Sequence, residues 1–65
     1  MCQARVYLVQ DGREQEIMQD VTLLEVVQGG VQVRTLFEAP VFVPGSIARV
    51  DLLKHTVTLQ PAEKG

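Results

Sequence analysis

The stretch VTLLEVVQGGVQVRTLF, residues 21–37, decides the fold of this chain. Two glycines, Gly29 and Gly30, stand between two segments that are rich in β-branched residues. Glycine adopts the backbone conformations of a tight turn without steric cost, so a Gly-Gly pair in this setting is a strong hairpin signal. We therefore predict two antiparallel strands, over residues 21–28 and 31–37, joined at the glycine pair.

The sequence before this hairpin continues the same pattern. Residues 3–10 place apolar side chains at every second position, which is typical of a strand with one buried face. Asp11-Gly12 follows as a turn signal, because both residues tolerate positive φ. Residues 14–18 are expected to return as another strand, with Asp20 marking the next corner.

The sequence after the hairpin predicts further short strands. Ala39-Pro40 interrupts the ladder, since proline has no backbone donor. The expected elements are then a brief apolar segment at 41–43, a turn at 44–45, a strand at 47–52, a loop at 53–55 and a last strand at 56–60. Short strands at this spacing, without a helical stretch, favour an all-β fold: one small β-barrel domain, residues 1–65, of about five to six short antiparallel strands.

Length and composition predict an association between subunits. A chain of 65 residues buries only about 60% of the surface that its unfolded form exposes, so its own core is marginal. Small domains usually add disulfides, a structural metal or a partner subunit. The single cysteine excludes an internal disulfide, and 46% of the residues are hydrophobic. We therefore expect part of the apolar surface to lie at a homodimer interface.

The charge pattern argues against two classes of partner. The net charge is −2 and the six basic residues form no run, so we expect no nucleic-acid binding. No segment is long enough to span a bilayer, and no signal peptide opens the chain, so we expect no membrane partner. A free thiol without a signal sequence fits a reducing, cytoplasmic location.

Cys2 is the most informative candidate for a functional residue. The Met1 amine, the Cys2 amide nitrogen and the Cys2 sulfur can close two fused five-membered chelate rings on one metal ion. Low-spin Ni(II) favours a square plane of nitrogen and sulfur donors. His55, the only histidine, is a further candidate nickel ligand, although an exposed turn residue is its simpler interpretation.

Other functions remain open on the residues alone. Catalysis is not expected, because the chain offers no nucleophile–base pair beyond Cys2 and His55, which are far apart in sequence. Tyr7, Phe37 and Phe42 suggest stacking platforms for single-stranded RNA, but both phenylalanines are better explained as core or interface. An RNA-binding barrel and a purely structural interaction module are therefore the alternatives to metal binding.

The whole chain also resembles the CooT family, which are small nickel-binding accessory proteins of carbon monoxide dehydrogenase maturation. The resemblance rests on the start Met1-Cys2, the strand ARVYL at 4–8, Gly30 before the next strand, Pro44-Gly45, and IARVDL at 47–52 leading into VTL at 57–59. It implies a dimeric, SH3-like small barrel with a nickel site on the N-terminal cysteine, here Cys2. It also implies a client enzyme such as carbon monoxide dehydrogenase, for which the protein acts as a metallochaperone or nickel store. Two Cys2 residues facing each other across a twofold axis would then share one metal ion.

Overall fold

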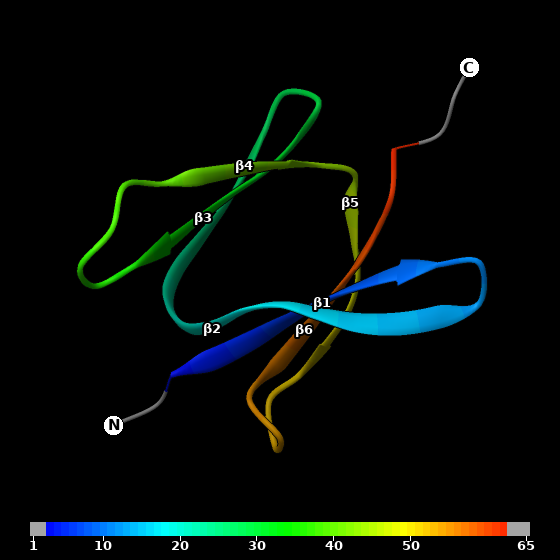
Figure 1. Cartoon of the computed structure of the whole chain (residues 1–65), viewed down its shortest axis with the longest axis horizontal. Helices are drawn as coiled ribbons and strands as arrows, with labels where there is room; N and C mark the ends of the chain where they lie inside the picture. Colours follow the sequence, from blue (N-terminus) through cyan, green and yellow to red (C-terminus); the bar gives the residue numbers. More distant parts are fainter. Residues whose placement is uncertain (1–2, 63–65) are drawn as a thin grey trace.

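The computed structural model describes residues 3–62, which form six β-strands in a single sheet (Figure 1). The strands are β1 (Ala4–Gln10), β2 (Arg13–Val27), β3 (Gly30–Thr35), β4 (Val41–Pro44), β5 (Ser46–Asp51) and β6 (Thr56–Gln60). Their order in the sheet is β4-β3-β2-β1-β6-β5. The all-β prediction is confirmed, and no helix among these residues is long and apolar enough to cross a membrane.

One neighbouring pair differs from the expected antiparallel arrangement. β1 and β6 run parallel, with Arg5 opposite Thr56 and Leu8 opposite Leu59, whereas the other four pairs are antiparallel. A parallel pair needs a long crossover connection, and here the crossover is the rest of the domain, β2 to β5. The first and last strands of the chain therefore lie side by side in the middle of the sheet.

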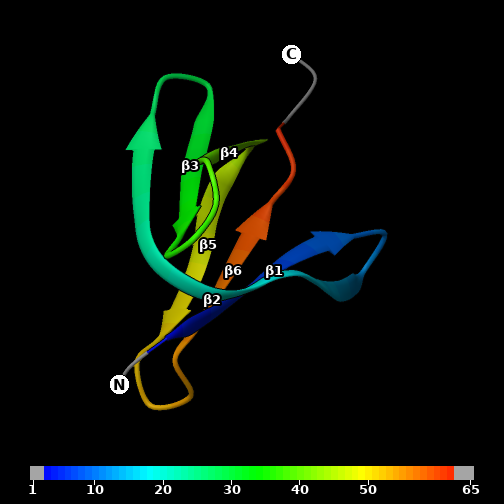
Figure 2. The same ribbon diagram turned by 60° about the vertical axis from the view of Figure 1, so that its left-hand side comes forward.

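The expected strands at 14–18 and 21–28 are one continuous strand, β2, and Asp20 is not a corner between two elements. Asp20 has a φ of 59°, and the register with β1 shifts on both sides of Val6. Such bulges bend a strand and increase its twist without ending the ladder. β2 consequently curves through the molecule and pairs with β1 along its first part and with β3 along its second part (Figure 2).

The two hairpins predicted from glycine are present, one of them shifted by a residue. Asp11 and Gly12 both have positive φ and connect β1 to β2 as expected. The β2–β3 turn consists of Gln28 and Gly29 rather than the two glycines. Gly30 is instead a buried residue of β3, where a Cβ would collide with the Val43 carbonyl oxygen and would lie 2.8 Å from the Phe42 ring.

The core is small and lies on one face of the curved sheet. It consists of Val6, Val21, Val31, Val33, Val43 and Leu59. These residues come from β1, β2, β3, β4 and β6, and β5 contributes no buried side chain to it. Because β-branched side chains pack well on a pleated surface, the predominance of valine fits this thin core.

The sheet does not close into a barrel with a full set of hydrogen bonds. β4 and β5 stand at its two ends and are not paired with each other within the described residues. They are joined at Gly45, whose amide lies 3.5 Å from the Gly29 carbonyl oxygen. The sheet is therefore left open in its hydrogen bonding, and β4 and β5 are its two edge strands.

Candidate functional site

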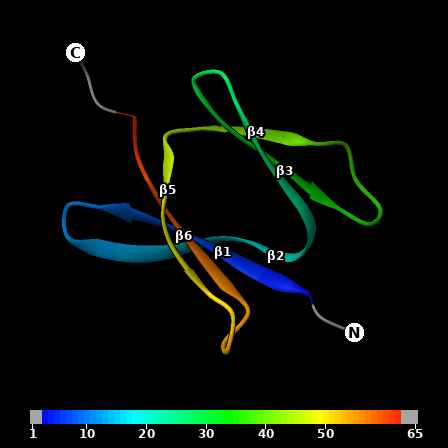
Figure 3. The ribbon, with the colours of Figure 1, turned by 180° about the vertical axis from the view of Figure 1, so that it is seen from behind.

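Met1 and Cys2 fall outside the described residues, so the environment of the candidate nickel site begins at Gln3. Gln3 is exposed and precedes β1. The start of β1 lies between the β3–β4 connection and the β5–β6 turn in each view of the molecule (Figures 1 and 3). Two loops that are distant in sequence, the β3–β4 connection and the β5–β6 turn, therefore flank the start of β1.

The β5–β6 turn is organised by Asp51. Its Oδ1 atom accepts hydrogen bonds from the backbone amides of Leu53, at 3.1 Å, and Lys54, at 3.0 Å. This is the usual way in which an aspartate side chain initiates a turn. His55 ends the turn in the left-handed region with a φ of 57°. The predicted loop at 53–55 is thus confirmed, extended by Leu52.

His55 is brought next to the first strand by the parallel pairing of β1 and β6. The Arg5 amide donates a hydrogen bond of 3.0 Å to the His55 carbonyl oxygen. Cys2 is joined to Arg5 by three peptide units, which span at most about 11 Å. The His55 turn is therefore held beside the start of β1, although Arg5 and His55 are 50 positions apart in the chain.

A small hollow connects the start of β1 with the His55 turn. Its volume is about 110 Å³, and it is lined by Gln3, Ala4, Val50, Asp51, Leu52, His55, Thr56 and Val57. The His55 side chain is exposed at this hollow, so its imidazole is accessible to a metal ion. Half of the lining residues are apolar, so part of the hollow's surface offers no hydrogen-bond partners to water.

A second hollow, of about 370 Å³, lies on the other side of Gln3. It is lined by Gln3, Met18, Gln19, Asp20, Thr35, Leu36, Phe37 and Glu38. Phe37 is 91% exposed, so of the two places expected for it, core or interface, the core is excluded. Together with Leu36, and with Leu52 and Leu53 of the β5–β6 turn, it forms a set of strongly exposed apolar residues, which we call the apolar rim.

The described residues do not contain a metal site of their own. Within residues 3–62 no three His, Asp or Glu side chains are grouped so that they could hold a metal ion.

A polar hollow that the sequence did not indicate lies on the outer face of the sheet. Arg49 and Glu14 form an ion pair there with an N–O distance of 3.0 Å. The hollow has a volume of about 330 Å³ and is lined by Tyr7, Glu14, Arg49, Asp51, Lys54, Thr56 and Thr58. Both charged side chains are largely solvated, so the pair contributes little to stability, about 0–1 kcal/mol. Only the three-dimensional register brings these residues together, 35 positions apart.

The phenylalanines do not lie on a basic surface, and Tyr7, whose hollow includes Arg49 and Lys54, shares that hollow with the carboxylates of Glu14 and Asp51. Phe37 shares its hollow with the carboxylates of Asp20 and Glu38, and no cation lines it. Phe42 lies on β4, where its ring covers Gly30. Phosphate-bearing ligands need positive charge near the stacking rings. The arrangement therefore gives the RNA-binding alternative no support.

These features define a class: a single, open, six-stranded β-sheet domain whose N-terminal strand emerges between exposed apolar loops. The chain belongs to the CooT family, described as CO dehydrogenase accessory protein CooT, whose model matches residues 1–60.

Two further comparisons show a similar fold and a similar sequence. The fold is similar to a crystal structure assigned as CooT from Carboxydothermus hydrogenoformans, with a TM-score of 0.83 and 21% identity, covering 95% of this chain and 100% of that one. An uncharacterized protein from Methanothermobacter thermautotrophicus is 28% identical over 60 residues, covering 92% of this chain and 89% of the relative.

Proposed function

We propose that this protein is a nickel-binding accessory protein that acts as a metallochaperone or nickel store, with CO dehydrogenase as its client. The observation that carries the proposal is membership of a family described as CO dehydrogenase accessory proteins. In this proposal the protein binds nickel and delivers it to the enzyme or stores it.

The ligands in this proposal are the Cys2 thiolate and the backbone nitrogens of Met1 and Cys2. Sulfur and nitrogen donors in a plane suit Ni(II), which is the cargo rather than a resident cofactor. The hydrogen bond between Arg5 and the His55 carbonyl supports a contribution from His55, because it keeps this turn within reach of the N-terminal segment. His55 is assigned the role of an accessory ligand.

The proposal includes a homodimer in which two Cys2 residues share one nickel ion. The apolar rim beside the start of β1 supports this part. Its residues Phe37 and Leu53 are 91% and 90% exposed, and exposed apolar patches on a protein surface commonly mark interaction sites. An isologous contact at this end would place identical residues face to face.

The test is a calorimetric titration with Ni(II) on the parent protein, Cys2→Ala, His55→Ala and the control Gln3→Ala. We expect one nickel per two chains for the parent and the control, and a thiolate-to-nickel charge-transfer band in the near ultraviolet. Cys2→Ala should lose the band and most of the affinity while its circular dichroism spectrum stays unchanged. His55→Ala should weaken binding less than tenfold.

If Cys2→Ala binds nickel as tightly as the parent, the proposed site is wrong. Client transfer is tested separately, by adding nickel-loaded protein to apo CO dehydrogenase and measuring the recovery of activity. Faster recovery than with the same amount of free nickel supports a chaperone, and no difference favours a store.

A further inference from the structure

We infer that the polar hollow on the outer face of the sheet is a binding site for a small oxyanion, a single carboxylate or phosphate group. This role goes beyond nickel binding and does not depend on it. Three features of the hollow carry it: a buried hydroxyl without a partner, two cations with unused donors, and two carboxylates that already have partners.

The floor of the hollow is a row of side chains on neighbouring strands. Tyr7 of β1 lies opposite Thr58 of β6, and Thr58 lies opposite Arg49 of β5. Directly opposed residues project from the same face, so these three side chains cross the outer face together. Val6 and Leu59, their neighbours along the strands, project to the other face and belong to the core.

Thr58 brings a hydroxyl without a partner to this floor. It is the only polar residue that is buried among residues 3–62, with 4% of its surface exposed. The hydrogen bonds that side chains make in this range do not include its hydroxyl. No fully enclosed side-chain oxygen or nitrogen there lacks a partner, so this hydroxyl still reaches solvent, and the hollow that Thr58 lines is its opening. A ligand that accepts a hydrogen bond from it removes the cost of leaving a buried donor unpaired.

Arg49 and Lys54 line the same hollow and have unused donors. The Nη2 atom of Arg49 donates to Oε2 of Glu14 at 3.0 Å, and its guanidinium makes no other hydrogen bond within residues 3–62. This contact is also the only ion pair in that range, so the Lys54 ammonium has no carboxylate partner there. A guanidinium presents several N–H groups in one plane, which matches the oxygens of a carboxylate or a phosphate.

The carboxylates of the hollow already have partners. Glu14 accepts the hydrogen bond from Arg49, and Oδ1 of Asp51 accepts those from the amides of Leu53 and Lys54. A cationic ligand would have to compete with these contacts, whereas an oxyanion meets free donors. The two carboxylates also restrict the ligand to one anionic group, because a second group would face like charges.

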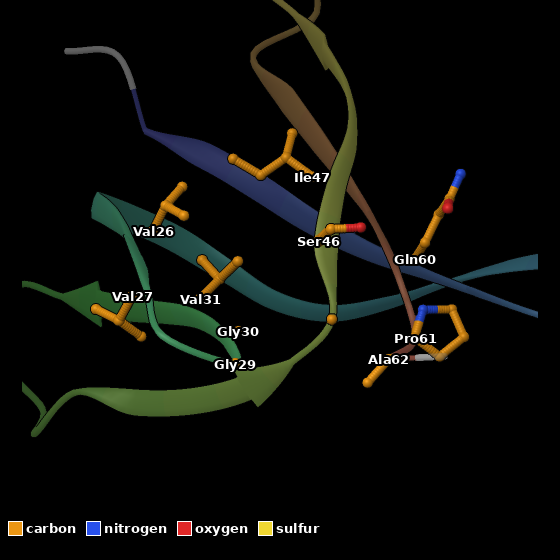
Figure 4. A pocket seen from close by; sticks show the side chains of 11 residues that line it. Val26, Val27, Gly29, Gly30, Val31, Ser46, Ile47, Gln60, Pro61 and Ala62 are labelled. Atoms are coloured by element: carbon orange, nitrogen blue, oxygen red, sulfur yellow. The ribbon is translucent and has the colours of Figure 1, made fainter. Parts of the chain in front are cut away.

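The size of the hollow suits such an ion. Its volume is about 330 Å³, which lies at the small end of the range for ligand sites, about 300–1,000 Å³. Another hollow, of about 570 Å³, is larger, but the described residues that line it carry no charge, as Val26, Ile47 and Pro61 illustrate (Figure 4). The smaller hollow is therefore the one whose chemistry specifies a class of ligand.

The site is tested by nuclear magnetic resonance titration of the isotope-labelled protein at constant pH and ionic strength. Sodium phosphate or sodium succinate replaces sodium chloride, so that ionic screening does not change. Because the Arg49 side chain is 63% exposed, we expect a dissociation constant of about 1 mM, with the largest amide shifts at Arg49, Lys54 and Thr58. Shifts with phosphate alone identify a phosphate site, and shifts with succinate alone a carboxylate site. Shifts with neither ion, or shifts centred elsewhere in the sheet, would overturn the inference.

The role of the buried hydroxyl is tested with Thr58→Val, which keeps the β-branched shape. We expect roughly threefold weaker anion binding or more, because the ligand loses a donor. The thermal midpoint should not fall, because the hydroxyl has no partner in the free protein. Thr35→Val, on β3 outside the hollow, is the matched control and should bind like the parent. If Thr58→Val binds the anion as tightly as its control does, the inference is wrong.

The role of charge is tested with substitutions that act in opposite directions. Arg49→Gln should weaken binding by roughly fivefold or more, while Arg34→Gln, on β3 outside the hollow, should bind like the parent. Glu14→Gln keeps an acceptor for Arg49 but removes a negative charge, so affinity should rise by about two- to threefold. Such a gain cannot come from a misfolded variant. Undiminished affinity in Arg49→Gln, or no gain in Glu14→Gln, contradicts an oxyanion site.

Discussion

Single residues decide whether the N-terminal segment can serve as a metal site. Cys2 must bind as a thiolate, and the backbone nitrogens beside it must also lose or lack protons to coordinate nickel. The chain around them is held by backbone contacts, because the hydrogen bond from Arg5 to the His55 carbonyl does not depend on a side chain. Substitutions at the ligands should therefore affect metal binding and leave the sheet intact.

Nickel affinity is expected to fall as the solution is acidified. Protons compete with the metal for the thiolate, so binding releases protons, and the affinity drops by about tenfold per pH unit for each proton released. Titrations in two buffers of different ionisation enthalpy measure that number directly. In Cys2→Ala the residual affinity should depend less steeply on pH, and an equally steep dependence would show that the thiol is not the titrating ligand.

Gly45 is expected to be the glycine least tolerant of substitution. Its φ is 137°, and a Cβ at this position would collide with the Gln60 backbone, where β4 turns into β5. Gly45→Ala should lower the free energy of unfolding by about 2–4 kcal/mol. Gly12→Ala is the matched control, because Gly12 also has positive φ but has no atoms near its Cβ position, so it should cost about 1 kcal/mol. Urea denaturation measures both, and a similar loss in the two variants would contradict the argument.

At the scale of elements, the long strand β2 depends on the conformation of one residue. Asp20 has the left-handed φ that lets β2 bend where its pairing passes from β1 to β3. Aspartate tolerates this conformation better than most residues, and a β-branched residue tolerates it poorly. The bend is thus encoded locally in a strand that otherwise alternates.

Substitutions at Asp20 should order themselves by their tolerance of positive φ. Asp20→Gly and Asp20→Asn should change the free energy of unfolding by less than about 0.5 kcal/mol, whereas Asp20→Val should lower it by about 1–2 kcal/mol. Thermal unfolding followed by circular dichroism distinguishes these outcomes. If valine is tolerated as well as asparagine, the bend does not depend on the backbone of this residue.

The elements that the sequence predicts well are those with a local signal. Asp11-Gly12 and the glycines near position 29 identify two hairpins, because a tight turn requires residues that tolerate positive φ and these can be recognised in the sequence. The parallel pairing of β1 with β6 has no local sequence signal. Without knowledge of this pairing, the sequence does not predict that His55 lies near the start of β1. The hydrophobicity of Phe37 left its place open between core and interface, because it does not reveal that β3 ends at Thr35.

At the scale of the whole molecule, the balance between buried and exposed apolar surface determines how stable the single chain is and whether it associates. The core has six buried apolar residues, whereas the described residues include twelve large hydrophobic side chains that are exposed. A fold with so little internal burial gains much of its stability from whatever covers the rest. The dimer is therefore expected to contribute to folding as well as to the metal site.

The thermal midpoint is accordingly expected to rise with protein concentration. When dissociation accompanies unfolding, a tenfold increase in concentration stabilises the dimer by mass action, and the midpoint of a domain of this size should rise by roughly 2–5 °C. Scanning calorimetry at several concentrations measures this shift. A concentration-independent midpoint in the parent protein would exclude a dimer that dissociates as it unfolds.

The parallel pair of β1 and β6 also has a consequence for the order of events during synthesis. Ala4–Gln10 are synthesised well before Thr56–Gln60, so β1 obtains its β6 neighbour only after the strands between them have been made. Such distant pairings form late, because the intervening chain must first lose its freedom. If the proposed nickel site requires the His55 turn beside the start of β1, we expect the ion to bind only after β6 has been made and has paired with β1.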